Sequence, residues 1–257
     1  MYKLVKRIID ILLSAIALLI ISPVFIICIV VLACTGEHDI WYLQKRVGYK
    51  NQRFNIFKFI TMVSNSTNLG TGSITLRNDP RVLPFGRILR KTKINELPQI
   101  FNVLNGTMSL VGPRPLMEVD FYKYPEQVQR TVYNSKPGIT GIGSIIFRDE
   151  ERYLSNPGIN PIEFYLNEVA PYKGALEMWY QNNASLWVDT KIVFLTAWVI
   201  LFPENNLPHR LLKNLPEKPE WMMPARESVS LYGNLKGLSV KPELINYSIT
   251  EKKDCND

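Results

Sequence analysis

The strongest pattern in the chain is an apolar run close to its N-terminus. From Ile8 to Cys34 there are 27 residues, of which only Asp10 is charged. As a helix the run is ~40 Å long, against ~30 Å for the hydrocarbon core of a bilayer. The apolar region of a cleavable signal peptide has only about 7–15 residues. We therefore predict that residues 1–36 form a membrane-embedded segment.

Ser22 and Pro23 interrupt this run near its middle. Pro23 removes one backbone donor and bends a helix, and Ser22 can satisfy a carbonyl group that Pro23 frees. Basic residues flank the run equally, so the positive-inside rule favours neither orientation. They are Lys3, Lys6 and Arg7 before the run, and Lys45, Arg46, Lys50 and Arg53 after it. We predict a re-entrant helix-break-helix that enters and leaves by one face, with a single kinked span as the alternative. Asp10 is interpreted as an interfacial residue that snorkels or pairs with Arg7.

A small strand pair and a helix are expected next. Residues 40–62 alternate apolar and basic positions around a turn with Gly48 and Asn51, which predicts a β-hairpin. Residues 65–73 are polar and predict a loop. Residues 80–94 then place three apolar side chains on one face of a helix, namely Phe85, Ile88 and Leu89.

A second helix is predicted to begin at Asn95 and to end at Gly106. Its apolar side chains recur at helical spacing, at Leu97, Ile100, Phe101 and Leu104. Asn95 is a favourable N-cap, and Glu96 suits the positive end of the helix dipole.

Two segments with glycine and proline predict turns. The segment Gly-Pro-Arg-Pro, residues 112–115, cannot be helical and holds Arg114 in a fixed place. Residues 136–144 are rich in glycine and are interpreted as a second turn, without a nucleotide-binding motif.

The last apolar run, Ile192 to Phe202, has eleven residues and is too short to span a membrane. Trp187 and Trp198 favour a helix at the membrane interface, while a buried core helix fits equally well. Residues 203–257 are polar and rich in proline, and are expected to form a surface wrap and a flexible tail.

Together these patterns predict an α+β fold that is mostly helical. A re-entrant membrane helix leads into a domain at residues 37–202, with a small β-hairpin and interfacial helices packed around the site. The formal net charge of +7 favours anionic partners. The basic residues are dispersed and form no recognised motif, so a nucleic-acid partner is disfavoured. The three cysteines have no metal-ligand spacing, and a disulfide framework is not expected.

The chain resembles the bacterial sugar transferases, small monotopic polyprenyl-phosphate phosphoglycosyl transferases, from about Lys3 to Phe202. The segments that carry the resemblance come in the family's order. They are "KRIIDILLS" with the Ser-Pro pair, "QKRVG", "FKFITM", "DPRV", "FGRILRK", "NELPQIFNVLNGTMSLVGPRPL", "KPGITG" and "WVDTKI". Each segment is weak evidence by itself, but their combination is specific.

The resemblance implies transfer of a sugar 1-phosphate from a nucleotide diphosphosugar, usually a UDP-sugar, to polyprenyl phosphate. This reaction starts the assembly of a bacterial surface glycan. The family's Asp-Glu dyad, which works with Mg²⁺, falls on Asn95 and Glu96, so Glu96 is the expected metal ligand. Phosphate-binding side chains are expected at Arg90, Arg114, Arg46, Lys58 and Arg81. Arginine binds phosphate through two parallel hydrogen bonds, and Mg²⁺ accepts one or two carboxylates plus phosphate oxygens.

Two positions depart from the family's pattern. Ile60 stands where an arginine is usual, and Asn95 replaces the nucleophilic aspartate. An amide is a far poorer nucleophile than a carboxylate. Three explanations stay open. The acceptor attacks the donor directly, another carboxylate takes over, or the protein binds substrates without converting them. The other carboxylates are Glu96 and the cluster Asp149, Glu150 and Glu151, which is interpreted mainly as a solvated charge cluster.

The resemblance also implies a location on the cytoplasmic face of the bacterial inner membrane, where nucleotide sugars are found. Expected partners are the donor, the polyprenyl phosphate and the membrane, with homo-oligomers or glycan-assembly proteins as further partners. The alternative function is that of a catalytically impaired binding or assembly partner in a glycan biosynthesis complex.

Overall fold

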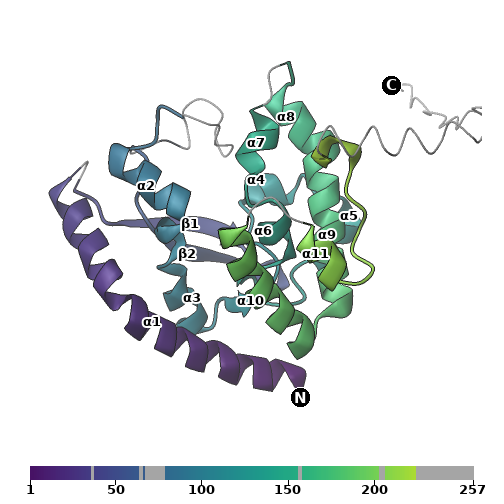
Figure 1. Ribbon diagram of the computed structural model, residues 1–257, viewed down its shortest axis with the longest axis horizontal. Helices are drawn as coiled ribbons and strands as arrows, with labels where there is room; N and C mark the ends of the chain where they lie inside the picture. Colours follow the sequence, from purple (N-terminus) through teal and green to yellow (C-terminus); the bar gives the residue numbers. More distant parts are fainter. Residues whose placement is uncertain (36–37, 64–65, 67–78, 156–157, 203–205, 224–257) are drawn as a thin grey trace, which may run out of the picture. The chain divides into compact units, whose positions relative to one another are not determined.

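The computed structural model describes residues 1–35, 38–63, 66, 79–155, 158–202 and 206–223. The chain divides into two units, Met1–Glu217 and Lys218–Asp257. Unit 1 is mostly helical with two small sheets, which confirms the predicted α+β class (Figure 1). The described part of unit 2 contains one short helix, Glu220–Met222.

The elements of unit 1 follow one another closely along the chain. The helices are α1 (Tyr2–Cys34), α2 (Pro84–Thr92), α3 (Gln99–Asn105), α4 (Glu118–Phe121), α5 (Glu126–Thr131), α6 (Ile142–Ile146), α7 (Glu150–Leu154), α8 (Pro161–Phe164), α9 (Ala170–Asn183), α10 (Leu186–Leu201) and α11 (Leu207–Leu211). Single turns of tighter or wider helix are η1 (Tyr49–Asn51), η3 (Ile94–Glu96) and η4 (Tyr165–Val169). The strands are β1 (Trp41–Val47), β2 (Arg53–Phe59), β3 (Ser109–Val111) and β4 (Gly138–Thr140).

The predicted β-hairpin is confirmed. Strands β1 and β2 pair antiparallel, from Trp41 opposite Phe59 to Val47 opposite Arg53, and η1 connects them. Alternate side chains of β1 turn from exposed to partly buried, as the period of two requires. The predicted loop at 65–73 lies outside the described residues except for Ser66.

The glycine-rich segment 136–144 was predicted as a turn, and this prediction is wrong. Residues Gly138–Thr140 form β4, which pairs in parallel with β3, and α6 begins two residues later. A side chain at Gly138 would place its Cβ 2.1 Å from the backbone nitrogen of Gly112. The glycine is therefore needed for the close approach of two backbones rather than for a reversal of the chain.

The prediction that Asn95 caps a helix is also wrong. Lys93, with φ +61°, ends α2, and Asn95 lies inside the single turn η3 without a capping hydrogen bond. The following helix α3 starts only after Pro98. Proline fixes a helical φ and so lets the chain turn into α3. Gly106 ends α3 with φ +87°, as predicted.

Helix α1 is continuous from Tyr2 to Cys34, so the predicted break into two helices does not occur. Pro23 lies inside it, and Figure 1 shows α1 as one curved helix. The hydroxyl of Ser22 donates to the carbonyl oxygen of Leu19 at 2.8 Å. This is the carbonyl that Pro23 leaves without its backbone donor, so Ser22 makes the compensating bond expected from the sequence.

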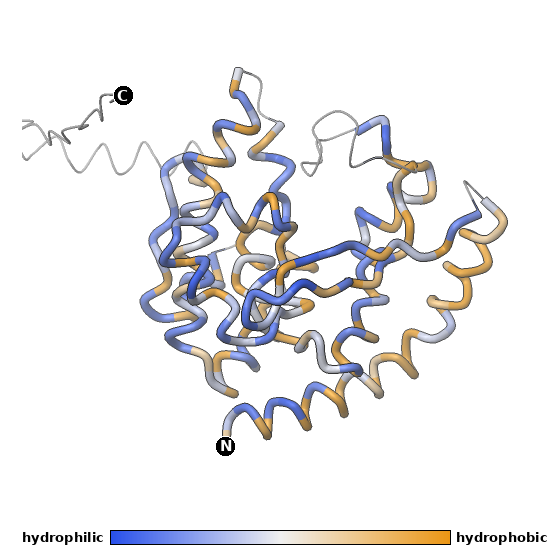
Figure 2. Tube along the Cα trace, turned by 180° about the vertical axis from the view of Figure 1, so that it is seen from behind, coloured by the Kyte–Doolittle hydropathy of each residue, from blue (hydrophilic) through white to orange (hydrophobic). Residues whose placement is uncertain are grey.

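One side of α1 packs along the rest of unit 1. Phe25, Cys28 and Leu32 are buried together with Phe59 of β2 and Leu89 of α2. The other side leaves a row of large apolar side chains exposed: Leu12, Ile16, Leu19, Ile20, Ile26, Ile27 and Val30. Figure 2 shows this apolar stretch from the middle of α1 to its C-terminal end. By length and composition α1 could cross a membrane, and part of it shares a core with the hairpin.

The interpretation of Asp10 as a snorkelling or Arg7-paired residue is wrong. Asp10 is buried and accepts a hydrogen bond from the backbone nitrogen of Leu110 in β3. Arg7 donates instead to the carbonyl oxygens of Val103 and Leu104, at 2.6 and 3.0 Å. These carbonyls belong to the last turn of α3, where helix carbonyls lack partners and cations are favoured. The start of α1 is thus bonded to α3 and β3.

A buried polar cluster joins the start of α1 to α9 and α10. Asp189 of α10 accepts hydrogen bonds from Tyr2 at 2.8 Å, Lys6 at 2.7 Å and Tyr180 at 2.7 Å. Tyr180 belongs to α9 and also contacts the carbonyl oxygen of Val111 at 3.4 Å. Three bonds to one buried carboxylate satisfy it well, as burial of a charge requires.

Helix α10 contains most of the last apolar run, for which an interfacial helix and a buried core helix were both predicted. Ile192, Leu195 and Val199 are buried, whereas Phe194 and Leu201 on the other side are exposed. The helix is therefore a core helix on one side and an uncovered apolar surface on the other. Residues 206–217 follow α10 and contact it and α9, since Trp179 donates to the carbonyl of Lys213 and Lys191 to that of Leu211. Residues 203–205 and 224–257, which include most of the predicted tail, lie outside the described residues.

Candidate active site

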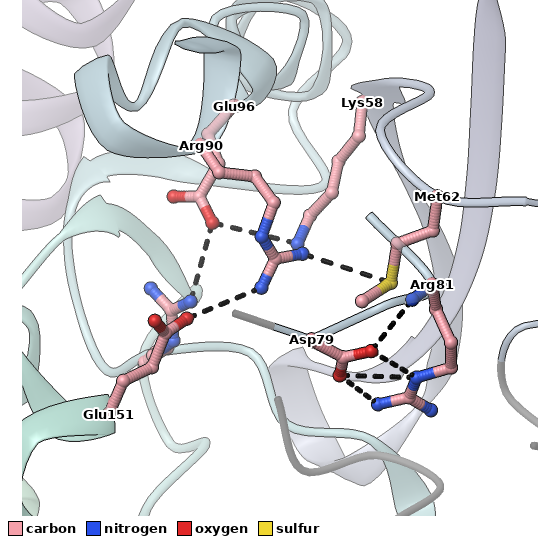
Figure 3. Close-up of polar contacts among 8 residues, drawn as sticks. Lys58, Met62, Asp79, Arg81, Arg90, Glu96 and Glu151 are labelled. Atoms are coloured by element: carbon pink, nitrogen blue, oxygen red, sulfur yellow. Dashed lines mark hydrogen bonds and ion pairs between the residues drawn. The ribbon is translucent and has the colours of Figure 1, made fainter. Parts of the chain in front are cut away.

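Glu96 lies at the centre of a cluster of cations that come from different elements. The guanidinium of Arg114, in the segment after β3, lies 3.3 Å from Glu96 Oε1, and the ammonium of Lys58 on β2 lies 3.6 Å from it. Figure 3 shows Lys58 and Glu96 pointing toward each other. A narrow cavity between these elements is lined by Arg46, Lys58, Glu96, Gln99 and Arg114. The predicted residues are thus brought together around the predicted metal ligand.

Asn102 of α3 fixes the position of Lys58 relative to Glu96. Its side chain accepts from the backbone nitrogen of Phe57 at 3.0 Å and donates to the carbonyl oxygen of Asn55 at 2.8 Å. Asn102 is fully buried, so these bonds to β2 are protected from water. They tie the strand that carries Lys58 to the helix that follows Glu96.

The charges of the cluster strongly affect one another. Burial would raise the pKa of Glu96, but Arg114, Lys58 and two further cations outweigh it and hold that pKa well below its usual range. Burial lowers the pKa of Lys58 to about 7, with Arg46, Arg114 and Arg90 adding to the effect and Glu96 opposing it. Glu96 therefore stays ionised, while Lys58 can change its charge near neutral pH.

Arg46 is held against the same cavity without touching Glu96. Its guanidinium donates to the side-chain oxygen of Gln44 and, at 3.2 Å, to the carbonyl oxygen of Pro115. Burial, followed by the charge of Arg114, lowers the pKa of Arg46 to about 10. Two arginines and a lysine thus line the cavity, whose described lining contains one carboxylate, Glu96, and this excess of positive charge suits an anionic ligand.

Arg90 of α2 lies at the edge of the cluster. Its guanidinium is 3.5 Å from Glu151 and 3.9 Å from the sulfur of Met62 (Figure 3). The interpretation of the acidic segment at 149–151 as a solvated cluster is wrong for Glu150 but not for Glu151, whose side chain is 42% exposed. Glu151 contacts Arg90, and Glu150 accepts two 2.7 Å bonds from the buried Lys173.

Arg81 is placed differently from the other predicted phosphate ligands. It is buried and bonded to Asp79 through the Nε and a terminal nitrogen, with a shortest distance of 2.6 Å. A further bond goes to the carbonyl oxygen of Ser66. Figure 3 shows Arg81 and Asp79 as a pair that points toward each other. Its role in phosphate binding stays a prediction.

Asn95 is buried beside Glu96 in the chain, and its side-chain oxygen has no hydrogen-bond partner among the described residues. A buried polar atom without a partner is costly and uncommon in native proteins. In the sequence, Asn95 stands where the resemblance expects the nucleophilic aspartate. The amide is thus not explained by helix capping or by another local bond.

Three residues of the site were not predicted. Lys93 adds positive charge next to Glu96, while Glu177 of α9 and Tyr133 bond to the backbone of Arg114. Lys93 could have been found, because it lies three residues before Glu96 in a basic segment. Glu177 and Tyr133 reach the site from 63 and 19 residues away, and no spacing in the sequence indicates that.

Comparisons with known proteins find a family that covers most of the chain. The family described as "Bacterial sugar transferase" matches residues 1–203. The undecaprenyl-phosphate galactose phosphotransferase of Salmonella typhimurium is 35% identical over 213 residues, which cover 77% of this chain and 41% of that protein. The UDP-N-acetylgalactosamine-undecaprenyl-phosphate N-acetylgalactosaminephosphotransferase of Aeromonas hydrophila is 33% identical over 78% of this chain and 44% of its own length.

The chain therefore spans less than half of the length of these two relatives. A shorter relative, the exopolysaccharide production protein ExoY of Rhizobium meliloti, is 30% identical over 74% of this chain and 83% of its own length. The match includes the start of α1, both strands of the hairpin, Glu96 and the segment with Arg114. On the extent of this match, the chain belongs to the bacterial sugar transferase family.

Proposed function

We propose that the protein transfers a sugar 1-phosphate from a UDP-sugar to a polyprenyl phosphate and so starts the assembly of a bacterial surface glycan. The relatives are named for such transfers to undecaprenyl phosphate, with galactose, glucose or N-acetylgalactosamine as the sugar. The observation that carries the proposal is the meeting of Lys58, Arg46 and Arg114 around Glu96.

The proposed donor fits the charge of this site. A diphosphate carries its negative charge on several oxygens and needs fixed donors on more than one side. Lys58, Arg46 and Arg114 belong to β2, β1 and the segment after β3, so they approach from separate elements. Their like charges repel each other in the cluster. An anion between them would relieve this repulsion, which favours the diphosphate over a neutral sugar as the anchoring group.

A magnesium ion fits the donor set only together with substrate. No group of three or more His, Cys, Asp or Glu side chains suited to a metal occurs among the described residues. Mg²⁺ is commonly held by one or two carboxylates plus substrate phosphates and water. Glu96 would supply the carboxylate, and the amide oxygen of its chain neighbour Asn95, which has no partner among the described residues, would be a second donor. A bound Mg²⁺ would neutralise charge on the diphosphate.

The absence of an aspartate at position 95 favours direct transfer. In this reaction an oxygen of the polyprenyl phosphate attacks the phosphorus that carries the sugar. A new phosphorus–oxygen bond forms, the bond to the other phosphate breaks, and UMP leaves with the bonding electrons. The acceptor phosphate is already an anion at neutral pH, so no general base is needed. Lys58, Arg46 and Arg114 hold the two phosphates in position, which is the main requirement of phosphoryl transfer.

We further propose that α1 is re-entrant and that the site lies on the cytoplasmic face of the bacterial inner membrane. Three observations support this arrangement. Helix α1 contains Pro23, basic residues flank it on both sides, and one side of it shares a core with the hairpin near its C-terminal end. Helix α1 is bonded to β3 at Asp10 and packs on β2 and α2 at Leu32. Its two ends therefore cannot lie on opposite faces of a bilayer unless the rest of unit 1 crosses the bilayer as well.

A panel of radiolabelled UDP-sugars with undecaprenyl phosphate and Mg²⁺ tests the proposed function. We expect one donor to yield a lipid-linked product, with release of an equal amount of UMP. The control is the Arg114→Ala variant, which lacks the anchoring guanidinium. Binding of a UDP-sugar without product, by the natural protein in the presence of acceptor, would overturn transfer and leave a substrate-binding role.

A further inference from the structure

The segment around Arg114 is bonded along its whole backbone. We call residues 112–116 the Arg114 loop. Its first residues are held by β4, because the nitrogen of Gly112 donates to the carbonyl oxygen of Thr140 at 3.0 Å and Pro113 accepts from Gly138 at 2.9 Å. Its last residue accepts from the nitrogen of Val47 in β1 at 2.9 Å. Backbone bonds of neighbouring strands thus fix both ends of the loop.

Arg114 itself is held in another way. Its nitrogen donates to Glu177 Oε1 at 3.3 Å, and its carbonyl oxygen accepts from the hydroxyl of Tyr133 at 2.9 Å. The same hydroxyl accepts from the nitrogen of Leu116 at 2.9 Å. Both backbone hydrogen bonds of Arg114 are therefore made with side chains, and Tyr133 holds the nitrogen of Leu116 as well.

Glu177 and Tyr133 are themselves firmly placed. Both are almost fully buried, with 3% and 1% of their surface exposed. The carboxylate of Glu177 packs closely on Gly143 of α6, where an added Cβ atom would lie 2.5 Å from Oε1. Burial raises the pKa of Tyr133 well above its usual range, and the hydroxyl stays protonated as a donor to Arg114. These side chains are rigid enough to define the position of the arginine.

We propose that Glu177 and Tyr133 are positioning residues that act through Arg114. They do not line the cavity beside Glu96, and they fix the backbone from which the guanidinium reaches the donor's diphosphate. The inference rests on the proposed function for the identity of the ligand, but not for the contacts. A displacement of about 1 Å at such a group can cost roughly 10²-fold in rate. The two side chains therefore matter for transfer although they touch no substrate.

Four conservative variants separate this role from a general contribution to folding. Tyr133→Phe keeps the ring and removes the hydroxyl. Glu177→Gln keeps an acceptor oxygen for the nitrogen of Arg114, and Glu177→Met keeps the size and removes the acceptor. Tyr172→Phe is the control, because Tyr172 is also buried and bonds to the carbonyl oxygen of Pro216 rather than to the Arg114 loop. Thermal unfolding confirms that each variant is folded.

Transfer is measured as kcat and KM for the UDP-sugar that the natural protein uses. We expect Tyr133→Phe and Glu177→Met each to lower kcat/KM by roughly tenfold to 10²-fold. Glu177→Gln and Tyr172→Phe should stay within about threefold of the natural protein, since the acceptor or the loop is preserved. Equal losses in Glu177→Gln and Glu177→Met, or in Tyr133→Phe and Tyr172→Phe, would overturn the proposal.

A double-mutant cycle tests whether the effect passes through Arg114. The dissociation constant of the UDP-sugar is measured by calorimetry for Arg114→Ala, Tyr133→Phe and the double variant. We expect Tyr133→Phe to weaken binding in the natural background but to add nothing to Arg114→Ala. Independent, additive losses would contradict the positioning role. This readout needs no turnover, so a protein that binds donor without transferring it would refute the proposed function and still test the inference.

Discussion

At the scale of single residues, Glu96 has two roles, and a mutation there affects both. Its charge holds Arg114 and Lys58 in place, and its carboxylate is the expected metal ligand. We predict that Glu96→Gln lowers transfer by ~10²–10³, which is typical for loss of one electrostatic group at a transferring phosphoryl. Steady-state assays measure it, with Glu126→Gln, an exposed residue paired with Arg130, as the control. Undiminished turnover in Glu96→Gln would exclude Glu96 from the site.

Because Glu96 is buried among cations, its mutation is also expected to lower stability. Glu96→Ala would leave Arg114, Lys58 and Lys93 without their shared counter-charge and is expected to be destabilised. Glu96→Gln is the better probe, since it keeps the shape of the side chain.

Asn95 decides between the two possible mechanisms. We predict that Asn95→Asp, given UDP-sugar and Mg²⁺ without acceptor, forms a phosphosugar adduct and releases a burst of UMP. The reason is that Asn95 stands at the sequence position of the family's nucleophilic aspartate, and its buried oxygen has no partner among the described residues. Intact-protein mass spectrometry detects the adduct. The natural protein should release UMP only with acceptor, so an adduct on it would identify another nucleophile, with Glu96 as the first candidate.

Lys58 makes donor binding depend on pH. Its pKa, lowered to about 7 mainly by burial, means that the free protein loses this charge as the pH rises through neutrality. An anionic donor favours the charged form, so binding should take up protons near pH 7–8 and weaken above that range. We predict that Lys58→Arg, which stays charged, weakens much less between pH 7 and 9. Calorimetry in buffers of different ionisation enthalpy measures both effects, and identical pH profiles would contradict the assignment.

At the scale of elements, the start of α1 is held by the cluster around Asp189. We predict that Asp189→Ala lowers the free energy of unfolding by ~3–5 kcal/mol, because it leaves the buried ammonium of Lys6 without a counter-charge. The double variant Lys6→Met, Asp189→Ala should regain part of this loss. Thermal unfolding in detergent measures it. The control Arg130→Met removes an exposed pair and should change stability by less than ~1 kcal/mol.

Elements that depend on neighbouring residues were predictable from the sequence. The hairpin at 41–59 follows from alternation around a short turn, and the end of α3 follows from Gly106. Strand β4 was missed, because its three residues are stabilised by pairing with β3 about 30 residues earlier. Asp10 was misinterpreted for the same reason, since its partner in β3 lies 100 residues away. Local patterns carry no information on such contacts.

The sequence predicted the site residues whose side chains can bind phosphate by their own chemistry. Arg46, Lys58 and Arg114 were expected to bind phosphate and do meet around Glu96. What could not be predicted is how they are supported. Gln44 lies within the same motif as Arg46, whereas Glu177 comes from a helix with no motif of its own. The apolar side chains after residue 95 recur at helical spacing, so the sequence pattern did not show that the single turn η3 and Pro98 come before α3.

At the scale of the whole molecule, the re-entrant arrangement can be tested by accessibility. Cysteines are introduced near residues 2 and 50 in a variant without Cys28, Cys34 and Cys255. We predict that a reagent which cannot enter cells labels neither position in intact cells and labels both after permeabilisation. Both ends of α1 contact the rest of unit 1, which holds the candidate site. Labelling of position 50 alone from outside would establish a simple crossing.

The bonds from Arg7 to the last carbonyls of α3 have a consequence for the reach of the enzyme into its lipid surroundings. Helix α3 has seven residues, or ~10 Å, and Glu96 lies three residues before its first residue, Gln99. It therefore acts as a spacer of fixed length between α1 and Glu96. If α1 lies in a bilayer as proposed, a thicker or thinner bilayer would change how much of α1 is covered by acyl chains, but not the distance from Glu96 to that helix. In the proposed reaction the protein, rather than the membrane, would then set the level at which a lipid-borne phosphate has to be presented.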